Sequence, residues 1–175
     1  LVGESGCGKS TFMRFLVALY RPDSGQILYR GQDITALRGE KLRQTRRHIQ
    51  MVFQDPGASF NPKMRVRDIV CEPLLNFGLI APKERAAVCR GLLEMVELPG
   101  DFADRYPHSM SGGQRQRVAI ARALALQPEI LIPDEATAAL DVSVQKTIIE
   151  LIVRLQRERG LTIGFICHDI ALVQS

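Results

Sequence analysis

Short, continuous apolar runs alternate with amphipathic segments along this chain of 175 residues. The runs at 49–53, 130–132 and 161–167 have the length of buried strands, whereas apolar residues elsewhere recur every three or four positions, which predicts helices. Continuous apolar strands alternating with helices are typical of a parallel sheet covered on both faces. The helices are expected at 11–20, 66–75, 82–96, 111–126 and 144–159.

Three local features sharpen this pattern. The first helix is expected to present Phe12, Phe15, Leu16 and Leu19 on one face. A turn at 22–25 leads into a short strand at 26–29, and the last helix should end at Gly160, since glycine commonly follows a helix C-terminus. The sequence therefore predicts an α/β fold.

The helical character is concentrated in one part of the chain. Residues from about 59 to 126 contain helical segments and no predicted strand, so they are interpreted as an inserted helical subdomain. About 1–58 and 127–175 then form the α/β core. A hydrophobic content of 46% is sufficient for a core in a chain of about one domain's length.

Charge and cysteine usage change this picture little. The net charge is +4, and much of it lies in the basic stretch 41–48. Because no aromatic residues interleave these basic ones, a solvated helix face is favoured over a nucleic-acid contact. The four cysteines show neither metal-ligand nor disulfide-framework spacing, which favours reduced thiols. No apolar run reaches the roughly 20 residues of a membrane span, so a cytosolic protein is expected.

The first candidate site lies at the start of the chain and fits the pattern G-x-x-x-x-G-K-[ST]. In such a loop the backbone N–H groups wrap a polyphosphate at a helix N-terminus. Lys9 would reach the β- and γ-phosphates, Ser10 would hold Mg²⁺, and Thr11 would add a hydroxyl. The alternative is a glycine-rich turn with a surface lysine. The phosphate loop comprises Gly3, Glu4, Ser5, Gly6, Cys7, Gly8, Lys9 and Ser10.

Two adjacent carboxylates follow the apolar run at 130–132. Asp134 would stand at the carboxyl edge of the sheet, where α/β proteins bind ligands, and would complete the Mg²⁺ shell with Ser10. Glu135 would polarise an attacking water. A solvated turn is the alternative for such a pair, and the upstream phosphate loop argues against it.

The third constellation opens the helix expected at 111–126. Ser111 is a good N-cap, and the paired glycines after it would let a phosphate approach the helix N-terminus closely. An ordinary capped helix explains the serine but not both glycines. The signature segment comprises Ser111, Gly112, Gly113 and Gln114.

Taken in order, these motifs, with Ala139-Leu140-Asp141 and the late His168-Asp169, resemble an ATP-binding cassette (ABC) transporter ATPase. The resemblance implies a P-loop NTPase fold that binds ATP and Mg²⁺, and two subunits that close head to tail around two ATP molecules. It implies Glu135 as the catalytic base, Gln54 as a Mg²⁺ contact that senses the membrane subunit, and His168 as a γ-phosphate contact. It also implies that Asp141 crosses the dimer interface and that the partner's signature segment contacts each ATP.

Finer features resemble the oligopeptide, dipeptide and nickel importers, and glutathione importers share much of the pattern. These features are Val52–Pro56 with Ser59–Met64, Arg105–His108, and Ala139–Gln145. The resemblance implies a subunit that binds transmembrane permease subunits at the cytoplasmic face of the inner membrane. The solute itself stays open, because specificity in such systems lies in other subunits.

The sequence departs from the family pattern in two respects. Pro133 precedes Asp134 and Ala136 follows Glu135, and a proline without a ladder donor is expected to displace Asp134 slightly. The chain also looks truncated at both ends, without the N-terminal aromatic that contacts adenine, and alone it is expected to fold poorly.

Two other functions stay open. A soluble ABC ATPase of DNA repair would have a long coiled coil between the phosphate loop and the signature segment. Here about a hundred residues without heptads separate them, which disfavours that function. A soluble ABC ATPase of translation would carry two cassettes on one chain. An ATP-binding pseudo-cassette with weak hydrolysis is disfavoured by Glu135 and His168 and favoured by Pro133.

Overall fold

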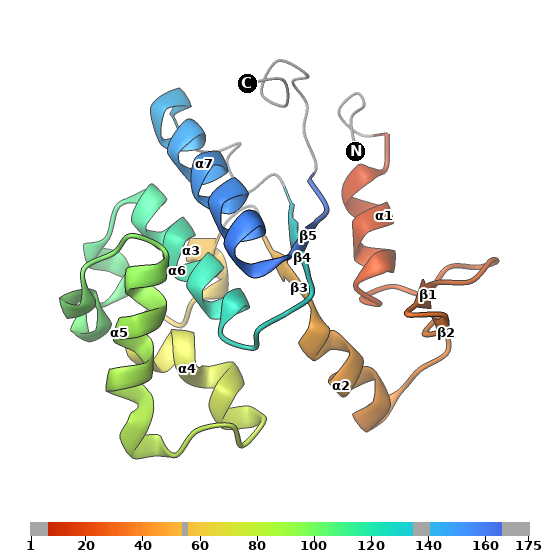
Figure 1. The fold of residues 1–175 in the computed structure, drawn as a ribbon, viewed down its shortest axis with the longest axis horizontal. Helices are drawn as coiled ribbons and strands as arrows, with labels where there is room; N and C mark the ends of the chain where they lie inside the picture. The colour runs from red at the N-terminus through yellow and green to blue at the C-terminus, as the bar shows by residue number, and fades with distance from the viewer. Residues whose placement is uncertain (1–6, 54–55, 135–140, 166–175) are drawn as a thin grey trace.

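The protein is described from a computed structural model, which defines the positions of residues 7–53, 56–134 and 141–165. Helices lie on both sides of a small sheet (Figure 1). The helices are α1 (Lys9–Leu16), α2 (Gly39–His48), α3 (Pro56–Ser59), α4 (Val66–Asn76), α5 (Arg85–Met95), α6 (Gly112–Leu124) and α7 (Val142–Arg159), with 3₁₀ turns η1 (Pro82–Glu84), η2 (Gly100–Asp104) and η3 (Pro107–Ser109). The strands are β1 (Leu28–Tyr29), β2 (Gln32–Asp33), β3 (Ile49–Val52), β4 (Ile130–Pro133) and β5 (Thr162–Ile163).

The central sheet is parallel, in the order β3-β4-β5, as the continuous apolar runs predicted. Ile49 of β3 lies opposite Ile130 of β4, which in turn lies opposite Thr162 of β5. Strands β1 and β2 form a separate antiparallel hairpin. Because β3, β4 and β5 run in one direction, their carboxyl ends meet at one edge, and Asp134 follows β4 at this edge.

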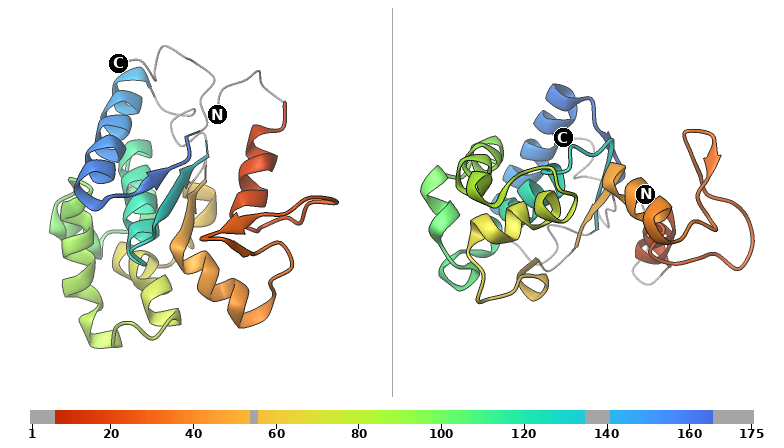
Figure 2. Two further views of the ribbon diagram at one scale, coloured as in Figure 1. Left: turned by 45° about the vertical axis from the view of Figure 1, so that its right-hand side comes forward. Right: turned by 90° about the horizontal axis from the view of Figure 1, so that it is seen from below.

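Residues of β4 alternate between two hydrophobic clusters, one on each face of the sheet. Leu131 belongs to a large cluster with residues of α4, α5, α6 and α7. Ile132 belongs to a smaller cluster with Met13 of α1 and Val17, which follows α1. Figures 1 and 2 show the same arrangement, with α1 on one side of the strands and α6 and α7 on the other. The fold therefore separates the helix that follows the phosphate loop from the helix that begins at the signature segment.

The first helix is shorter than predicted and packs through a different face. It ends at Leu16 rather than Tyr20, because Ala18 adopts a left-handed conformation (φ 54°) that the helix cannot continue through. Met13 and Val17 are each 4% exposed, whereas Phe12 is 51% exposed. The helix carries two apolar stripes, and periodicity alone cannot determine which one packs on the sheet.

Other boundaries differ more modestly. The helix expected at 82–96 is divided into η1 and α5, while α7 begins two residues earlier than predicted and ends before Gly160 as predicted. The strand expected at 161–167 corresponds to β5, which spans Thr162–Ile163 within the described residues. These differences lie at element ends, where capping rather than periodicity decides the boundary.

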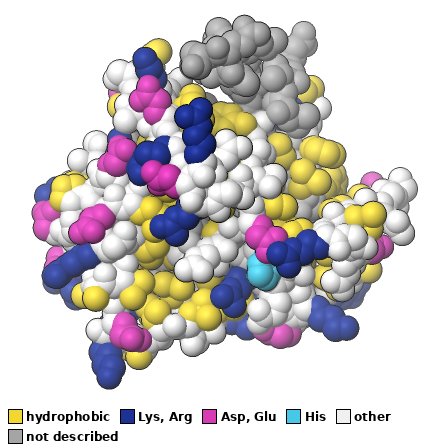
Figure 3. Space-filling view, in the orientation of Figure 1, with side chains coloured by type: hydrophobic (Ala, Val, Ile, Leu, Met, Phe, Trp, Pro, Cys, Tyr) yellow, Lys and Arg dark blue, Asp and Glu magenta, His cyan; other side chains and the backbone are white. Residues whose placement is uncertain are grey.

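The surface carries interspersed charges of both signs, and hydrophobic side chains gather over α1 (Figure 3). Helix α2, which holds the basic stretch, has no buried residue, as predicted for a solvated helix. Within the described residues, no helix is long and apolar enough to cross a membrane.

Candidate nucleotide and metal site

Two predicted site residues from distant parts of the chain meet at the carboxyl edge of the sheet. The Ser10 hydroxyl donates a hydrogen bond of 2.9 Å to Asp134 Oδ1. Ser10 lies in the first turn of α1, which follows Gly8. Gly8 has φ 90°, a conformation that glycine adopts without steric cost. The turn into α1 and the end of β4 thus bring a hydroxyl and a carboxylate together.

Asp134 is 4% exposed, so its charge requires partners. In addition to Ser10, Arg14 places a guanidinium nitrogen 3.8 Å from Asp134 Oδ2. Arg14 was not among the predicted site residues, although its position four residues after Ser10 on one helix face was a usable signal. Arg14 thus provides a positive charge beside a carboxylate that burial would otherwise destabilise.

Pro133 does not interrupt the sheet at this edge. It lies opposite Val52 in the parallel register, and the Asp134 N–H donates to the Val52 carbonyl at 2.9 Å. Proline has no backbone N–H to donate, but the next residue, Asp134, does donate to the neighbouring strand. The register of β3 and β4 therefore continues up to Asp134, while the expected small displacement of Asp134 stays a prediction.

The donor set fits Mg²⁺. This ion prefers oxygen ligands, keeps several waters and is often held by only one or two protein groups together with substrate phosphates. Ser10 and Asp134 supply a hydroxyl and a buried carboxylate within hydrogen-bonding distance of each other. Within the described ranges no cluster of three or more His, Cys, Asp or Glu side chains forms a metal cage. The remaining coordination positions are thus suited to water and phosphate.

Lys9 begins α1 and is 6% exposed, which is unusual for a lysine. Its Nζ donates to Cys7 Sγ at 3.7 Å. Cys7 and Thr11 are exposed. The lysine side chain is therefore directed to Cys7 rather than extended into solvent.

The signature segment forms the capped start of α6. The Ser111 hydroxyl accepts a hydrogen bond of 3.3 Å from the Gln114 N–H, and the Gln114 side-chain oxygen accepts one of 2.9 Å from the Ser111 N–H. This reciprocal pair satisfies two backbone donors at the helix start. Ser111 remains exposed, while Gly112 and Gly113 are partly buried.

Asp141 caps α7 and is exposed. Its Oδ1 accepts hydrogen bonds from the Ser143 hydroxyl at 2.7 Å and from the Val144 N–H at 3.0 Å. These two bonds, the hydroxyl first, hold the pKa of the Asp141 carboxyl below its ordinary value. Asp141 is therefore a fixed negative charge at the helix N-terminus at neutral pH.

Seven predicted site residues lie outside the described residues. They are Gly3, Glu4, Ser5, Gly6, Gln54, Glu135 and His168.

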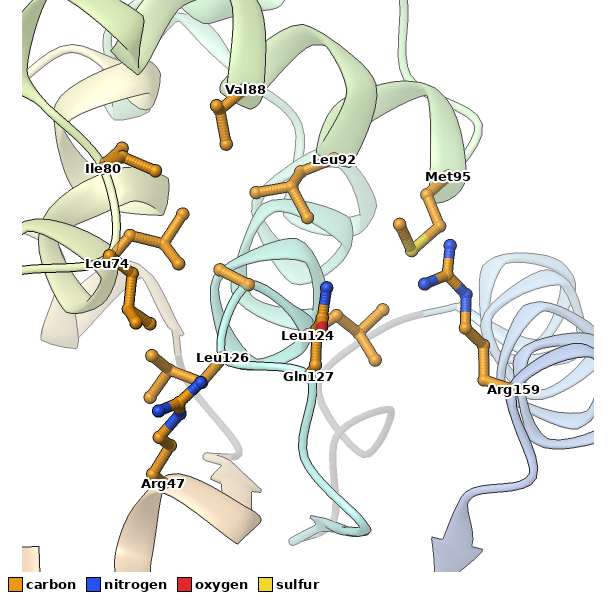
Figure 4. A pocket seen from close by; sticks show the side chains of 12 residues that line it. Arg47, Leu74, Ile80, Val88, Leu92, Met95, Leu124, Leu126, Gln127 and Arg159 are labelled. Carbon is orange, nitrogen blue, oxygen red and sulfur yellow. The ribbon is translucent and has the colours of Figure 1, made fainter. Parts of the chain in front are cut away.

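A cavity of about 310 Å³ lies apart from these residues, along α5 and beside the ends of α2, α4, α6 and α7. Figure 4 shows Leu74, Leu92 and Leu124 among the apolar side chains that point into it, with Arg47 and Arg159 at its rim. It contains none of the predicted nucleotide or metal residues.

Comparison with known proteins identifies the family. The sequence profile described as "ABC transporter" matches residues 1–138, and the chain belongs to this family. It is 53% identical over 175 residues to the oligopeptide transport ATP-binding protein AppF of Bacillus subtilis, covering 99% of this chain and 53% of that protein. It is 51% identical over 174 residues to the glutathione import ATP-binding protein GsiA of Escherichia coli K12, covering 99% of this chain and 28% of that protein.

The fold is also similar to that of solved ATP-binding cassettes. A dimeric structure of the ATP-binding cassette MJ0796 bound to ADP and phosphate superposes with a TM-score of 0.85 at 35% identity, covering 98% of this chain and 74% of that one. The predicted P-loop NTPase fold is thereby confirmed. The chain spans about half the length of the curated oligopeptide relatives that it matches.

Proposed function

We propose that this chain is the nucleotide-binding part of a subunit that hydrolyses ATP to power an ABC importer. The observation that carries the proposal is the 2.9 Å hydrogen bond between Ser10 and Asp134. It joins the end of the phosphate loop to the carboxyl edge of the sheet, where a Mg²⁺-bound triphosphate is held in P-loop NTPases. The named relatives, which are transport ATP-binding proteins, support the same activity.

In this proposal each residue has a defined task. Lys9 binds the β- and γ-phosphates, and the N-terminus of α1 adds backbone donors. Ser10 and Asp134 hold Mg²⁺, which when bound neutralises charge that develops on the phosphates. Glu135 accepts a proton from the attacking water, while His168 and Gln54 contact the γ-phosphate and the metal.

The signature segment acts on the nucleotide of a partner subunit. Its helix, α6, lies on the opposite face of the sheet from α1, the helix that begins with Lys9 and Ser10 (Figure 1). A head-to-tail dimer resolves this separation, because each segment then faces the partner's phosphate loop. The MJ0796 structure with ADP and phosphate is dimeric, which supports a dimer of such subunits.

Peptides are the solute class that we propose, with glutathione within that class. The oligopeptide and glutathione relatives support it at 49–53% identity. We further propose that about 59–126 forms the helical subdomain and docks a permease at the cytoplasmic face of the inner membrane, while about 1–58 and 127–175 form the nucleotide core.

The experiment is a comparison of the full-length natural subunit with its Lys9→Ala variant. The variant loses a phosphate-facing charge that nothing replaces, so ATP affinity should fall by about tenfold or more. Equal ATP affinity of the parent and the variant in a binding titration would refute the proposed role of Lys9 in the phosphate loop. The solute class is tested separately, by uptake of labelled oligopeptides into cells that carry either the parent or the variant subunit. We expect Lys9→Ala to abolish uptake. Undiminished uptake would contradict the transport role.

A further inference from the structure

The cavity beside α5 has mostly apolar walls and a volume of about 310 Å³. Leu74 of α4, Leu92 of α5 and Leu124 of α6 point into it (Figure 4). Small ligands occupy sites of about 300–1,000 Å³, so this volume lies at the lower end of that range. None of the described residues that line the cavity is acidic. The cavity is therefore suited to a small apolar group and not to a cation.

Two arginines lie at the rim of this cavity. Arg47 is the penultimate residue of α2, and Arg159 is the last residue of α7 (Figure 4). Within the described residues, neither guanidinium has an ion-pair partner. The Nε atom of Arg47 is also buried without a hydrogen-bond partner, and an unpaired buried donor costs free energy. A negative charge beside Arg47 would supply the counter-charge that this guanidinium lacks.

Positive charge continues from Arg47 along α2. A second cleft, of about 420 Å³, shares Arg47 with the first and is also lined by Arg43 and Arg46. Glu40 pairs with Arg43 at 2.9 Å, whereas no carboxylate among the described residues pairs with Arg46 or Arg47. This side of the cavity therefore attracts anions.

The walls favour an alkyl chain over a peptide. Apart from the two arginines, the one polar side chain among the described lining residues is Gln127, which is exposed. A peptide in this cavity would bury N–H and C=O groups with few side-chain partners, whereas an alkyl chain has no such groups. At about 30 Å³ for each water-sized group, the cavity holds about ten of them, which corresponds to a chain of about eight to ten carbons.

We propose that this cavity binds a medium-chain fatty acid. The alkyl chain lies among the leucines, the carboxylate pairs with Arg47, and Arg159 adds a second positive charge at the rim. The cavity lies toward the amino end of β4, which Gln127 precedes, whereas Asp134 follows the carboxyl end of the same strand. The fatty-acid site is therefore separate from the nucleotide and metal site, and the inference goes beyond the proposed function.

The first test is isothermal titration calorimetry of the full-length natural subunit with sodium decanoate, which should show saturable binding at one site. Arg47→Gln should weaken this binding by about tenfold or more, because the charge-assisted pair is lost. It should not lower Tm, since the Arg47 guanidinium has no partner to lose. Arg157→Gln is the control, because Arg157 is exposed on α7 and does not line the cavity. It should bind decanoate like the parent.

A second pair of variants tests the cavity independently of charge. Val88 is partly buried and points into the cavity, whereas its neighbour Ala87 is exposed and does not line it (Figure 4). Val88→Phe fills part of the space and should weaken decanoate binding by about tenfold or more. Ala87→Phe adds a ring outside the cavity and should leave the affinity unchanged.

The ligand itself is varied in the same assay. 1-Decanol has the chain without the charge, so it should bind at least about tenfold more weakly than decanoate. Trileucine has apolar side chains and a carboxylate but also buries peptide groups, so it should not bind at concentrations at which decanoate saturates the site. ATP affinity should be equal in the parent and in all four variants, because none of them alters the phosphate loop.

The outcomes decide between these explanations. Absence of saturable decanoate binding overturns the inference, and so does parent-like decanoate affinity in either Arg47→Gln or a folded Val88→Phe. Tighter binding of trileucine than of decanoate assigns the cavity to peptides and overturns it as well. A parent subunit that fails to bind ATP refutes the proposed function instead, and leaves the decanoate result to be judged by itself.

Discussion

The Ser10 hydroxyl and the Asp134 carboxylate lie 2.9 Å apart and join the first turn of α1 to the end of β4. Asp134 has a second, longer contact with the Arg14 guanidinium at 3.8 Å. The buried carboxylate thus has one neutral and one charged partner, both on α1. If Mg²⁺ binds at the proposed site, Ser10 and Asp134 would be the residues that hold it.

Asp134→Asn should weaken Mg²⁺ binding more than nucleotide binding. The amide oxygen can still accept from Ser10, so the fold is retained, but the charge that attracts the metal is lost. We expect the Mg²⁺ concentration for half-maximal ATP binding to rise by about tenfold or more, with ATP affinity in EDTA nearly unchanged. Mg²⁺ titrations with a fluorescent ATP analogue measure this.

The matched control is Asp101→Asn, which removes an exposed carboxylate paired with Arg105. It should leave the Mg²⁺ requirement unchanged. An Asp134→Asn protein with the parent's Mg²⁺ requirement would show that this carboxylate is not a metal ligand.

Ser111 should have two separable roles, as helix cap and as contact to the partner's nucleotide. Ser111→Ala removes the cap and should lower the free energy of unfolding by about 1 kcal/mol. Ser111→Asp keeps a capping oxygen but places a negative charge where a γ-phosphate is expected. We expect the aspartate variant to melt like the parent and to lose ATP hydrolysis, while the isolated subunit still binds ATP. Hydrolysis at the parent rate by Ser111→Asp would contradict a phosphate contact at this position.

A hydrogen bond from the hairpin of β1 and β2 to Glu129, the residue before β4, should fail in alkali. The Tyr29 hydroxyl donates to Glu129 Oε2 at 2.7 Å. Burial, followed by this hydrogen bond to a carboxylate, raises the pKa of Tyr29 from its ordinary 10.0 to about 12. The folded state therefore favours neutral tyrosine, and its contribution to stability is complete below pH 10 and is lost as the pH rises toward 12.

Tyr29→Phe removes both the hydroxyl and its titration. The parent should lose stability relative to this variant between pH 10 and 12, as measured by denaturant unfolding, and the absorbance of the tyrosinate form should place the pKa of Tyr29 above 10. Parallel stability profiles for the two proteins over this range would show that Tyr29 has the same pKa folded and unfolded.

Much of the fold followed from periodicity, and the exceptions have local causes. The apolar runs that became β3 and β4 are buried on both faces, so their composition alone indicated a parallel sheet. The orientation of α1 did not follow, because Phe12 and Met13 are both apolar and only tertiary packing determines which is buried. The predicted end of α1 was also wrong, because the positive φ of Ala18 ends the helix and an alanine does not indicate a positive φ.

The site residues were predictable to the extent that motifs specify them. The phosphate-loop pattern and the strand-end carboxylate already implied that Ser10 and Asp134 belong to one site. Arg14 contacts Asp134 from a different element, and its only sequence signal was its position four residues after Ser10. The paired glycines at 112 and 113 predict phosphate approach, which stays a prediction; the structure adds that a Cβ atom on Gly113 would lie 2.7 Å from Val144 Cγ1.

The central claim is that each ATP is held between the phosphate loop of one subunit and the signature segment of another. Glu135→Gln tests it most directly, because it removes the proposed base with little change in volume. Hydrolysis should fall by at least about a hundredfold while ATP affinity stays close to that of the parent. An ATP-dependent dimer should therefore accumulate, and sedimentation velocity in the presence of ATP and Mg²⁺ should detect it.

The decisive measurement adds Ser111→Arg to the same full-length protein. The account predicts that Glu135→Gln sediments as a dimer with ATP, and that the double variant binds ATP with equal affinity but remains a monomer. Hydrolysis of ATP by Glu135→Gln at the parent rate, or an ATP-dependent dimer that survives Ser111→Arg, would contradict the account.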